Sequence, residues 1–251
     1  MKRVLTLLVI ALLTLATDAS AAAPKSKGSN FFRRMETGDY NRFYLSYGLT
    51  WIGWPEPKVD VKKSEFPFLY GLNLGYLHAS NIAKGIPLYI EYGASFQYTF
   101  GNNHIYQQRV PGSKTKDVTH INMYSVNVPV NLTMRFTLGN RRCSLSPYVG
   151  INLRANLGGD KRRVRIYDFV HQAVRKVDRY RLFDSSDEFD AMGEKALKRF
   201  QPGVNFGLGF TYGRFYVGAG CLFDVMDIIQ CEEGGYVGKF GIANISVGVT
   251  F

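Results

Sequence analysis

KFGIANISVGVTF, residues 239–251, closes the chain. Its odd-numbered residues from Ala243 to Phe251 are all apolar, whereas the even-numbered residues from Asn244 to Thr250 are all small or polar. A period of two is typical of a β-strand whose two faces meet different surroundings. The stretch therefore predicts a strand, and the fold class depends on whether the rest of the chain repeats this pattern.

The same alternation recurs in seven earlier segments. They span residues 42–53, 65–77, 86–100, 120–138, 143–157, 203–213 and 215–224. One face of each segment is apolar, nearly free of charge and rich in aromatic residues near the strand ends. The other face is rich in glycine and poor in Lys and Glu, which normally cover a water-exposed strand face. The high content of Tyr, Phe and Gly also favours strands and tight turns over helices.

An apolar outside with aromatic borders around a small, polar interior describes a transmembrane β-barrel. The alternative is a secreted sandwich in which the apolar face is the core. Long and short connections alternate along the chain, as expected for external loops and periplasmic turns when both termini are periplasmic. The sequence therefore predicts an all-β, eight-stranded antiparallel up-and-down transmembrane barrel. Its first strand, 42–53, should pair with the closing strand, because a barrel leaves no open edge.

The N-terminal region has the pattern of a secretory signal. Lys2 and Arg3 precede an apolar run from Val4 to Ala16, followed by a small-residue cleavage site at 19–21. The run is shorter than the ~20 residues of a spanning helix, which argues against the alternative of a membrane anchor. The expected organisation is a cleaved signal peptide at 1–21, a flexible periplasmic segment at 22–41 and the barrel at 42–251. We therefore expect export to the outer membrane of a Gram-negative bacterium.

Several strands carry sequence that resembles a known family. They read YSVNVPVNLTMRF at 124–136, SPYVGINL at 146–153, GVNFGLGFTYG at 203–213 and NISVGVTF at 244–251. The chain resembles the PorT-like small outer-membrane barrels, and more distantly the eight-stranded OmpA/OmpX type, over residues 42–251. The resemblance implies a membrane component of a secretion or assembly system. It also implies that Phe251 is part of the signal read by the barrel-assembly machinery; the alternative is an interfacial anchor.

Charged residues are also expected inside the barrel, whose interior is just wide enough for side chains. Inward glycines leave volume there for large groups such as Tyr148. Glu91 and Arg135 should lie at similar depth on neighbouring strands, and we predict that they form an ion pair. Arg154 and Asp224 both fall nearer the external mouth. These residues are either a gate or polar binding site, or buried pairs that satisfy each other and define the strand register.

The longest connection, residues 158–202, has a basic first half and a second half with a helix signal. Its basic residues include Lys161, Arg162, Arg163, Arg165, Arg175 and Lys176. We expect the flanking strands to continue there as a hairpin above the membrane. Ser185, three residues before Glu188, forms a capping box and predicts a short surface helix. The basic half either contacts lipid phosphates or a partner, or is a solvated loop.

The net charge of +11 would suit nucleic acid, but an exported chain rarely meets it. We expect no nucleic acid; the expected partners are outer-membrane lipid including lipopolysaccharide, the barrel-assembly machinery, and an envelope or secretion-system protein. His104 and His120 lie on an external loop, yet no spacing matches a catalytic set or a complete metal site. No cofactor motif is present, and a Cys221–Cys231 bridge is left open. The sequence favours a non-enzymatic barrel with a structural or surface-interaction role; a rim-site enzyme acting on lipid or peptide and a narrow channel are the alternatives.

Overall fold

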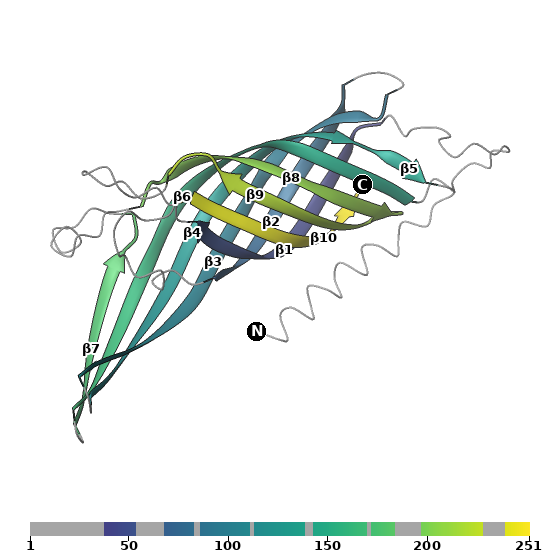
Figure 1. Ribbon diagram of the computed structural model, residues 1–251. Helices are drawn as coiled ribbons and strands as arrows, with labels where there is room; N and C mark the ends of the chain where they lie inside the picture. The colour runs from purple at the N-terminus through teal and green to yellow at the C-terminus, as the bar shows by residue number, and fades with distance from the viewer. Residues whose placement is uncertain are drawn as a thin grey trace.

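The computed structural model describes residues 38–53, 68–82, 86–110, 113–138, 143–169, 172–183, 197–227 and 239–251. The strands are β1 (Tyr40–Gly53), β2 (Leu69–Asn81), β3 (Leu88–Val110), β4 (Ser113–Met134), β5 (Phe136–Leu138), β6 (Cys143–Phe169), β7 (Gln172–Arg181), β8 (Phe200–Tyr212), β9 (Phe215–Asp224) and β10 (Lys239–Thr250). They form one antiparallel sheet that curls into a barrel (Figure 1). Within these ranges no helix is long and apolar enough to cross a membrane.

The sheet closes on itself, so eight strands form the barrel wall. The order β4-β3-β2-β1-β10-β9-β8-β6 is completed by a pairing of β4 with β6. β5 continues the line of β4 beyond Arg135, and β7 pairs with β6 outside the barrel. β1 and β10 pair along their length, from Arg42 opposite Thr250 to Gly53 opposite Lys239. This confirms the predicted barrel and the pairing of its first and last strands.

The apolar face of the strands points outward. Leu74, Ile151 and Ile245 are 58%, 54% and 65% exposed, which is the reverse of a sandwich core. On β4 the outward band runs from Tyr124 to Met134, about 34 Å along the strand at ~3.4 Å per residue. With the 35–45° tilt of barrel strands its height is about 25 Å, the height of a lipid-facing band.

Aromatic rings lie along both borders of this outward band. Near one border the contacting rings are those of Tyr47, Tyr70, Phe100, Tyr98 and Tyr124. Near the other they are those of Phe43, Tyr76 and Phe251. Two aromatic borders around an apolar band are the pattern of barrels that cross a bilayer.

Glycines on the inner face make room for tyrosine rings, as the sequence predicts. A Cβ atom on Gly207 or Gly220 would lie 2.4 or 2.2 Å from the Tyr148 hydroxyl oxygen. A Cβ atom on Gly218 would lie 2.2 Å from the hydroxyl oxygen of Tyr216. Real Cβ contacts are not this short, so these rings could not occupy their present positions next to larger residues.

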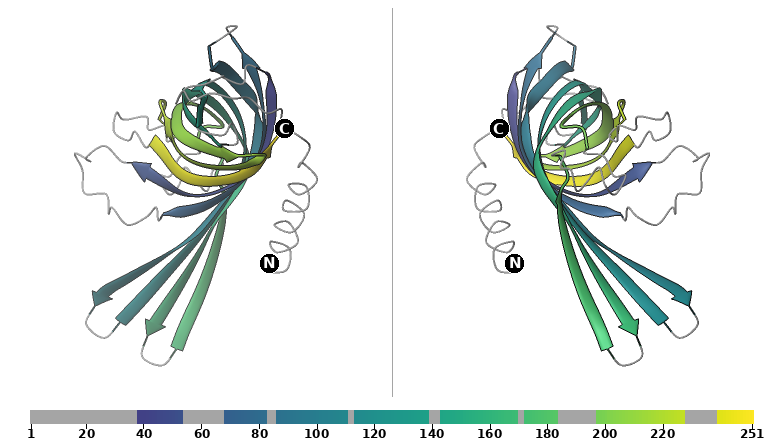
Figure 2. Two further views of the ribbon diagram at one scale, coloured as in Figure 1. Left: turned by 90° about the vertical axis from the view of Figure 1, so that its right-hand side faces the viewer. Right: turned by 90° about the vertical axis from the view of Figure 1, so that its left-hand side faces the viewer.

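Four strands extend beyond the barrel. β3, β4, β6 and β7 pair side by side and protrude as an open sheet, here called the outer sheet (Figure 2). The sequence predicts a long external loop between the segments 86–100 and 120–138. This prediction is wrong, because β3 continues to Val110 and β4 begins at Ser113. The hairpin predicted for the basic half of 158–202 is confirmed as β6 and β7.

Four predictions fall wholly or partly outside the part of the chain that the structure describes. The signal peptide at 1–21 and most of the segment at 22–41 are among them, although β1 already begins at Tyr40. The capping-box helix begins at Ser185, within the stretch 184–196 that the structure leaves out. Cys231 is also outside, while Cys221 is a free cysteine.

Candidate functional site

The barrel has two ends, which differ in how they are closed. The turn end carries Phe251 and the tight turn between β8 and β9, where Gly213 has a φ of 59° that favours glycine. The loop end is the one from which the outer sheet leaves the barrel. The polar interior between them contains the charged residues that the sequence singled out.

A buried ion pair lies at the turn end. Arg42 and Glu91 are 3% and 1% exposed, and Nη1 of Arg42 is 3.2 Å from Oε1 of Glu91. The hydroxyl of Tyr40 donates to the same carboxylate oxygen. The Arg42 guanidinium lies 3.9 Å from the ring centre of Tyr216, and its Nε donates to Thr250 Oγ1 at 3.5 Å. These contacts connect β1, β3, β9 and β10 across the lumen.

Arg135 belongs to the same turn-end cluster. Its guanidinium lies 4.9 Å from the ring centre of Tyr40, and its Nε donates to Ser144 Oγ at 3.1 Å. The Glu91 partner that the structure identifies is Arg42, which sequence reasoning missed. The Glu91–Arg135 pair itself stays a prediction. The contact of Arg42 with Glu91 was not predictable, because Arg42 is on β1, which is not a neighbour of β3 in the sheet.

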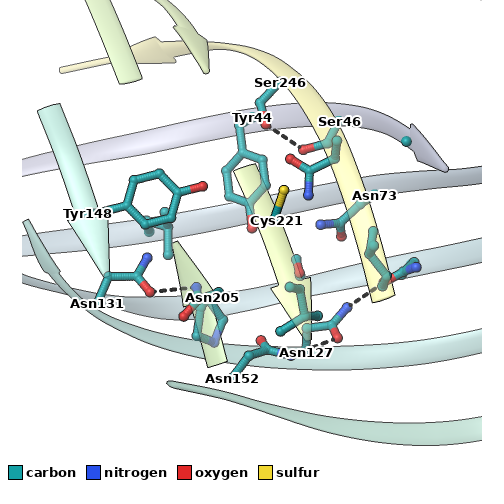
Figure 3. A pocket seen from close by; sticks show the side chains of 18 of the residues that line it. Tyr44, Ser46, Asn73, Asn127, Asn131, Tyr148, Asn152, Asn205, Cys221 and Ser246 are labelled. Carbon is teal, nitrogen blue, oxygen red and sulfur yellow. Dashed lines mark hydrogen bonds between the residues drawn. The ribbon is translucent and has the colours of Figure 1, made fainter. Parts of the chain in front are cut away.

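The middle of the lumen is an amide-rich layer around a small cavity (Figure 3). Asn127 links Gln97 and Asn152 through hydrogen bonds of 3.1 and 3.2 Å, and Asn205 donates to Asn131 at 2.7 Å. The cavity has a volume of about 90 Å³, enough for a few water molecules. A cavity of this size is too small to hold a drug-sized ligand.

A second ion pair lies at the loop end of the lumen. Nη2 of Arg154 donates to Oδ1 of Asp224 at 2.5 Å, and both side chains are buried. The guanidinium also lies 5.2 Å from the ring centre of Phe240. The structure thus brings together the two charged residues that the sequence placed near this mouth.

An apolar cluster lies against that ion pair through Phe240. Leu182, Phe183 and Leu197, which follow β7 and precede β8, fold back onto the inner face of the mouth; we call these three residues the apolar plug. They pack with Leu69, Ile121, Met123 and Phe240 in one buried cluster. The backbone N–H of Leu182 donates to Gly159 O at 3.0 Å, and that of Leu197 donates to Leu182 O at 2.7 Å.

Sequence reasoning missed the apolar plug, although a signal for it was present. Leu69, Phe240 and Ile242 occupy inward positions where the other strands place small or polar residues. Apolar residues on the inner face need an apolar partner inside the mouth. Because that partner comes from a long connection, no local pattern identifies it.

The two histidines considered for an enzyme site, His104 and His120, lie on β3 and β4. Among the residues that the structure describes, no group of three or more His, Cys, Asp or Glu could hold a metal ion. Nδ1 of His120 is hydrogen-bonded to Asn102 Oδ1 at 2.5 Å, on the outward face of the outer sheet. His104 is on β3, in register with Val118. What the interior can do chemically is hold buried charge pairs across the lumen and keep the barrel closed.

The basic residues of 158–202 divide between the two faces of the outer sheet. Lys161 is buried at the mouth, whereas Arg162 is only half-buried on the opposite face. Lys176 is 61% exposed and lies 3.6 Å from Asp178. The remaining predicted residues, Arg163, Arg165 and Arg175, are on β6 and β7. The predicted hairpin is therefore part of a sheet in which Lys161 and Arg162 lie on opposite faces.

Phe251 is anchored at the turn end. Its ring stacks on that of Phe43 with 5.9 Å between centroids. Its N–H donates to Asn41 O at 2.9 Å, and the N–H of Asn41 donates to Phe251 O at 2.7 Å. The aromatic ring is half exposed on the outer band, which suits an interfacial anchor as well as a recognition signal.

Replacing Phe251 with alanine separates these two roles. Loss of one aromatic pair should cost the assembled barrel about 0.5–1.5 kcal/mol. If Phe251 is also read during assembly, the yield of inserted barrel in cells should fall at least tenfold. Phe43→Ala is the matched control, since it removes the same ring contact and keeps the last residue. Equal yields for the two variants, measured by the heat-modified band on gels, would leave Phe251 with the anchor role alone.

Comparisons with known proteins give fold-level likenesses. No family model matches the chain, and no curated protein matches it. The chain is similar to small outer-membrane β-barrels. Ail, the attachment invasion locus protein of Yersinia pestis, is 13% identical over 84% of this chain and 98% of its own, with a TM-score of 0.34. Neisserial surface protein A is 11% identical over 85% and 97%, with a TM-score of 0.38. The outer membrane protein OprG of Pseudomonas aeruginosa is 13% identical over 86% and 96%, with a TM-score of 0.39.

Proposed function

We propose that this protein is a non-enzymatic barrel of the Gram-negative outer membrane that presents the outer sheet for interactions at the cell surface. The observation that carries the proposal is the combination of an apolar outer band with buried side-chain clusters at both ends of the lumen. The band, about 25 Å high, suits the hydrocarbon layer of a bilayer. The lumen holds a buried ion pair at each end and the apolar plug at one of them.

The outer sheet is the part of the described structure that is placed to meet partners. On β6 it extends from Gly159, at the mouth, to Phe169, about 33 Å along the strand at ~3.3 Å per residue. A sheet of this length that projects beyond the barrel stands clear of the lipid on the external side. A role in a secretion or assembly system would act through the same surface.

Insertion is tested by reconstituting the full chain into phospholipid vesicles. We expect the barrel to resist protease there and to migrate differently on gels before and after heating. A chain that stays soluble without detergent and does not enter vesicles would overturn the proposal.

The channel alternative has its own test in planar-bilayer recording. We expect no stable conductance from the inserted protein, because the amide layer holds a cavity of only about 90 Å³ between the buried side-chain clusters at the two ends of the lumen. A reproducible conductance step from the wild-type chain would favour the channel instead.

The enzyme alternative depends on the two external histidines. We expect no release of fatty acid or peptide when the inserted protein is incubated with envelope lipid or protein substrate. If release does occur, and His104→Ala or His120→Ala abolishes it, the enzyme would replace the surface role.

A further inference from the structure

A β-bulge decides which face of the outer sheet carries which basic residues. Tyr124 pairs with Gly158 whereas Ser125 pairs with Asn156, so β6 has one extra residue at the mouth. A bulge re-aims the side chains that follow it. Arg154, before the bulge, points into the lumen, and the even-numbered Asp160 and Arg162 after it lie on the outward face.

This outward face is continuous with the lipid-facing band. Its first rows above Tyr124 hold Asn122 and then His120 on β4. In register with His120, Arg162 lies on β6 and Arg179 on β7, so three adjacent strands place these side chains in one row. Together with Asn122 and Asp160, these three side chains line a hollow of about 470 Å³. We call His120, Arg162 and Arg179 the basic row.

Among the residues that the structure describes, neither arginine of the basic row forms an ion pair. Arg162 and Arg179 are directly opposite each other on neighbouring strands, an arrangement of like charges that destabilises a sheet. Nε of Arg162 is buried, with no hydrogen-bond partner in the part of the chain that the structure describes. The nearby carboxylate of Asp160 has other contacts: it accepts from Nδ2 of Asn122 at 3.4 Å, and Arg181 lies opposite it in register. An anion between the two arginines would resolve their repulsion.

The row lies a few ångströms above the headgroup region of a bilayer, within reach of it for long side chains. His120 is four residues beyond Tyr124, about 13 Å along the strand and about 10 Å in height after the tilt of barrel strands. Each headgroup region extends about 5–8 Å beyond the hydrocarbon core. Long arginine side chains bend toward that level. Asn122 also accepts from the Tyr98 hydroxyl at 3.0 Å, which connects the hollow to the aromatic border.

We propose that His120, Arg162 and Arg179 bind a phosphate group of a phosphorylated glycolipid in the outer leaflet. Planar guanidinium groups suit phosphate because each can donate two parallel hydrogen bonds to its oxygens. His120 is held in the row by its hydrogen bond to Asn102. The inference rests on the proposed outer-membrane barrel, since that placement brings lipid phosphates to the row.

The test measures glycolipid retention by the full-length chain. Vesicles of phosphatidylcholine with one tenth bisphosphorylated lipid A are used to reconstitute the protein, which is then extracted in mild detergent, and bound lipid A is counted by native mass spectrometry. We expect Arg162→Ala/Arg179→Ala to lower the retained lipid A at least tenfold. The matched control is Arg165→Ala/Lys176→Ala. These two residues form another cross-strand pair of β6 and β7, three positions further along the sheet, so the control removes the same charge from outside the basic row. It should retain lipid A as the wild type does.

Further measurements distinguish a lipid phosphate from free phosphate. They also distinguish failure of the lipid site from failure of the barrel to insert. Dephosphorylated lipid A should be lost from the wild type, and millimolar inorganic phosphate should not displace the phosphorylated form. Equal retention by both double variants, displacement by free phosphate, or preferential binding of a sulfated polysaccharide would each overturn the lipid site. Heat-modified gel mobility is recorded for every sample, so a wild-type chain that fails to insert contradicts the proposed function rather than this site.

Discussion

Replacing Glu91 with alanine is expected to destabilise the inserted barrel by about 3–5 kcal/mol. The change leaves the Arg42 guanidinium buried without its carboxylate and removes the acceptor of the Tyr40 hydroxyl. Breaking a buried ion pair on one side costs this much because the remaining charge is uncompensated. The measurement is urea unfolding in detergent micelles, followed by tryptophan fluorescence and by gel mobility without heating.

Two further variants show whether the loss comes from the buried charge. Glu91→Leu combined with Arg42→Met removes both charges, and we expect it to recover most of the stability, since apolar replacements of buried pairs are often neutral. Asp178→Ala breaks the exposed pair with Lys176 and should cost less than about 1 kcal/mol. If Glu91→Ala unfolds at the wild-type urea concentration, the turn-end cluster does not stabilise the barrel.

Replacing Leu182 and Phe183 together with aspartate is expected to expel the apolar plug while the barrel stays folded. Burying the two apolar side chains contributes about 1.5–3 kcal/mol each, and a carboxylate in their place would be desolvated without a partner. The displaced population should therefore rise more than 100-fold. Trypsin cleavage after Lys198 reports this opening, and we expect it to become at least tenfold faster.

The matched control for the apolar plug is Val177→Asp, which introduces the same group at a residue already 40% exposed on β7. Its cleavage rate should equal that of the wild type. The expelled variant should still show no stable conductance, because the Arg42–Glu91 cluster closes the other end. Unchanged cleavage of the Leu182→Asp/Phe183→Asp chain would show that the plug does not hold the mouth closed.

The eight barrel strands, their inward and outward faces and the barrel closure were predictable from local patterns, whereas the extension of β3 and β4 beyond the barrel was not. In the closing stretch 239–251, each side chain's face follows from its position, since successive residues of a strand point to opposite sides. The pattern repeats in eight strands, and nothing else in the sequence covers their apolar face. A closed barrel is the arrangement in which the backbone N–H and C=O groups of every strand are hydrogen-bonded. The glycines opposite Tyr148 and Tyr216 were predictable for the same reason, because their face was already known.

The partners across the lumen and the apolar plug were not predictable in this way. Arg42 and Glu91 are on strands that are not neighbours, so their contact exists only once the sheet has curled. Leu182 and Leu197 reach the mouth from a long connection, whose return path no local pattern encodes.

The bulge in β6 shows most clearly what local alternation predicts and what only the folded sheet decides. Period-two alternation, continued past residue 157, would assign Arg162 to the lumen with Arg154. One extra residue reverses that assignment and places Arg162 beside His120 and Arg179 on the outward face. Composition and alternation are local properties, and they sufficed for the barrel. The position of a bulge depends on how two strands 30 or more residues apart pair with each other, so the basic row required the folded sheet.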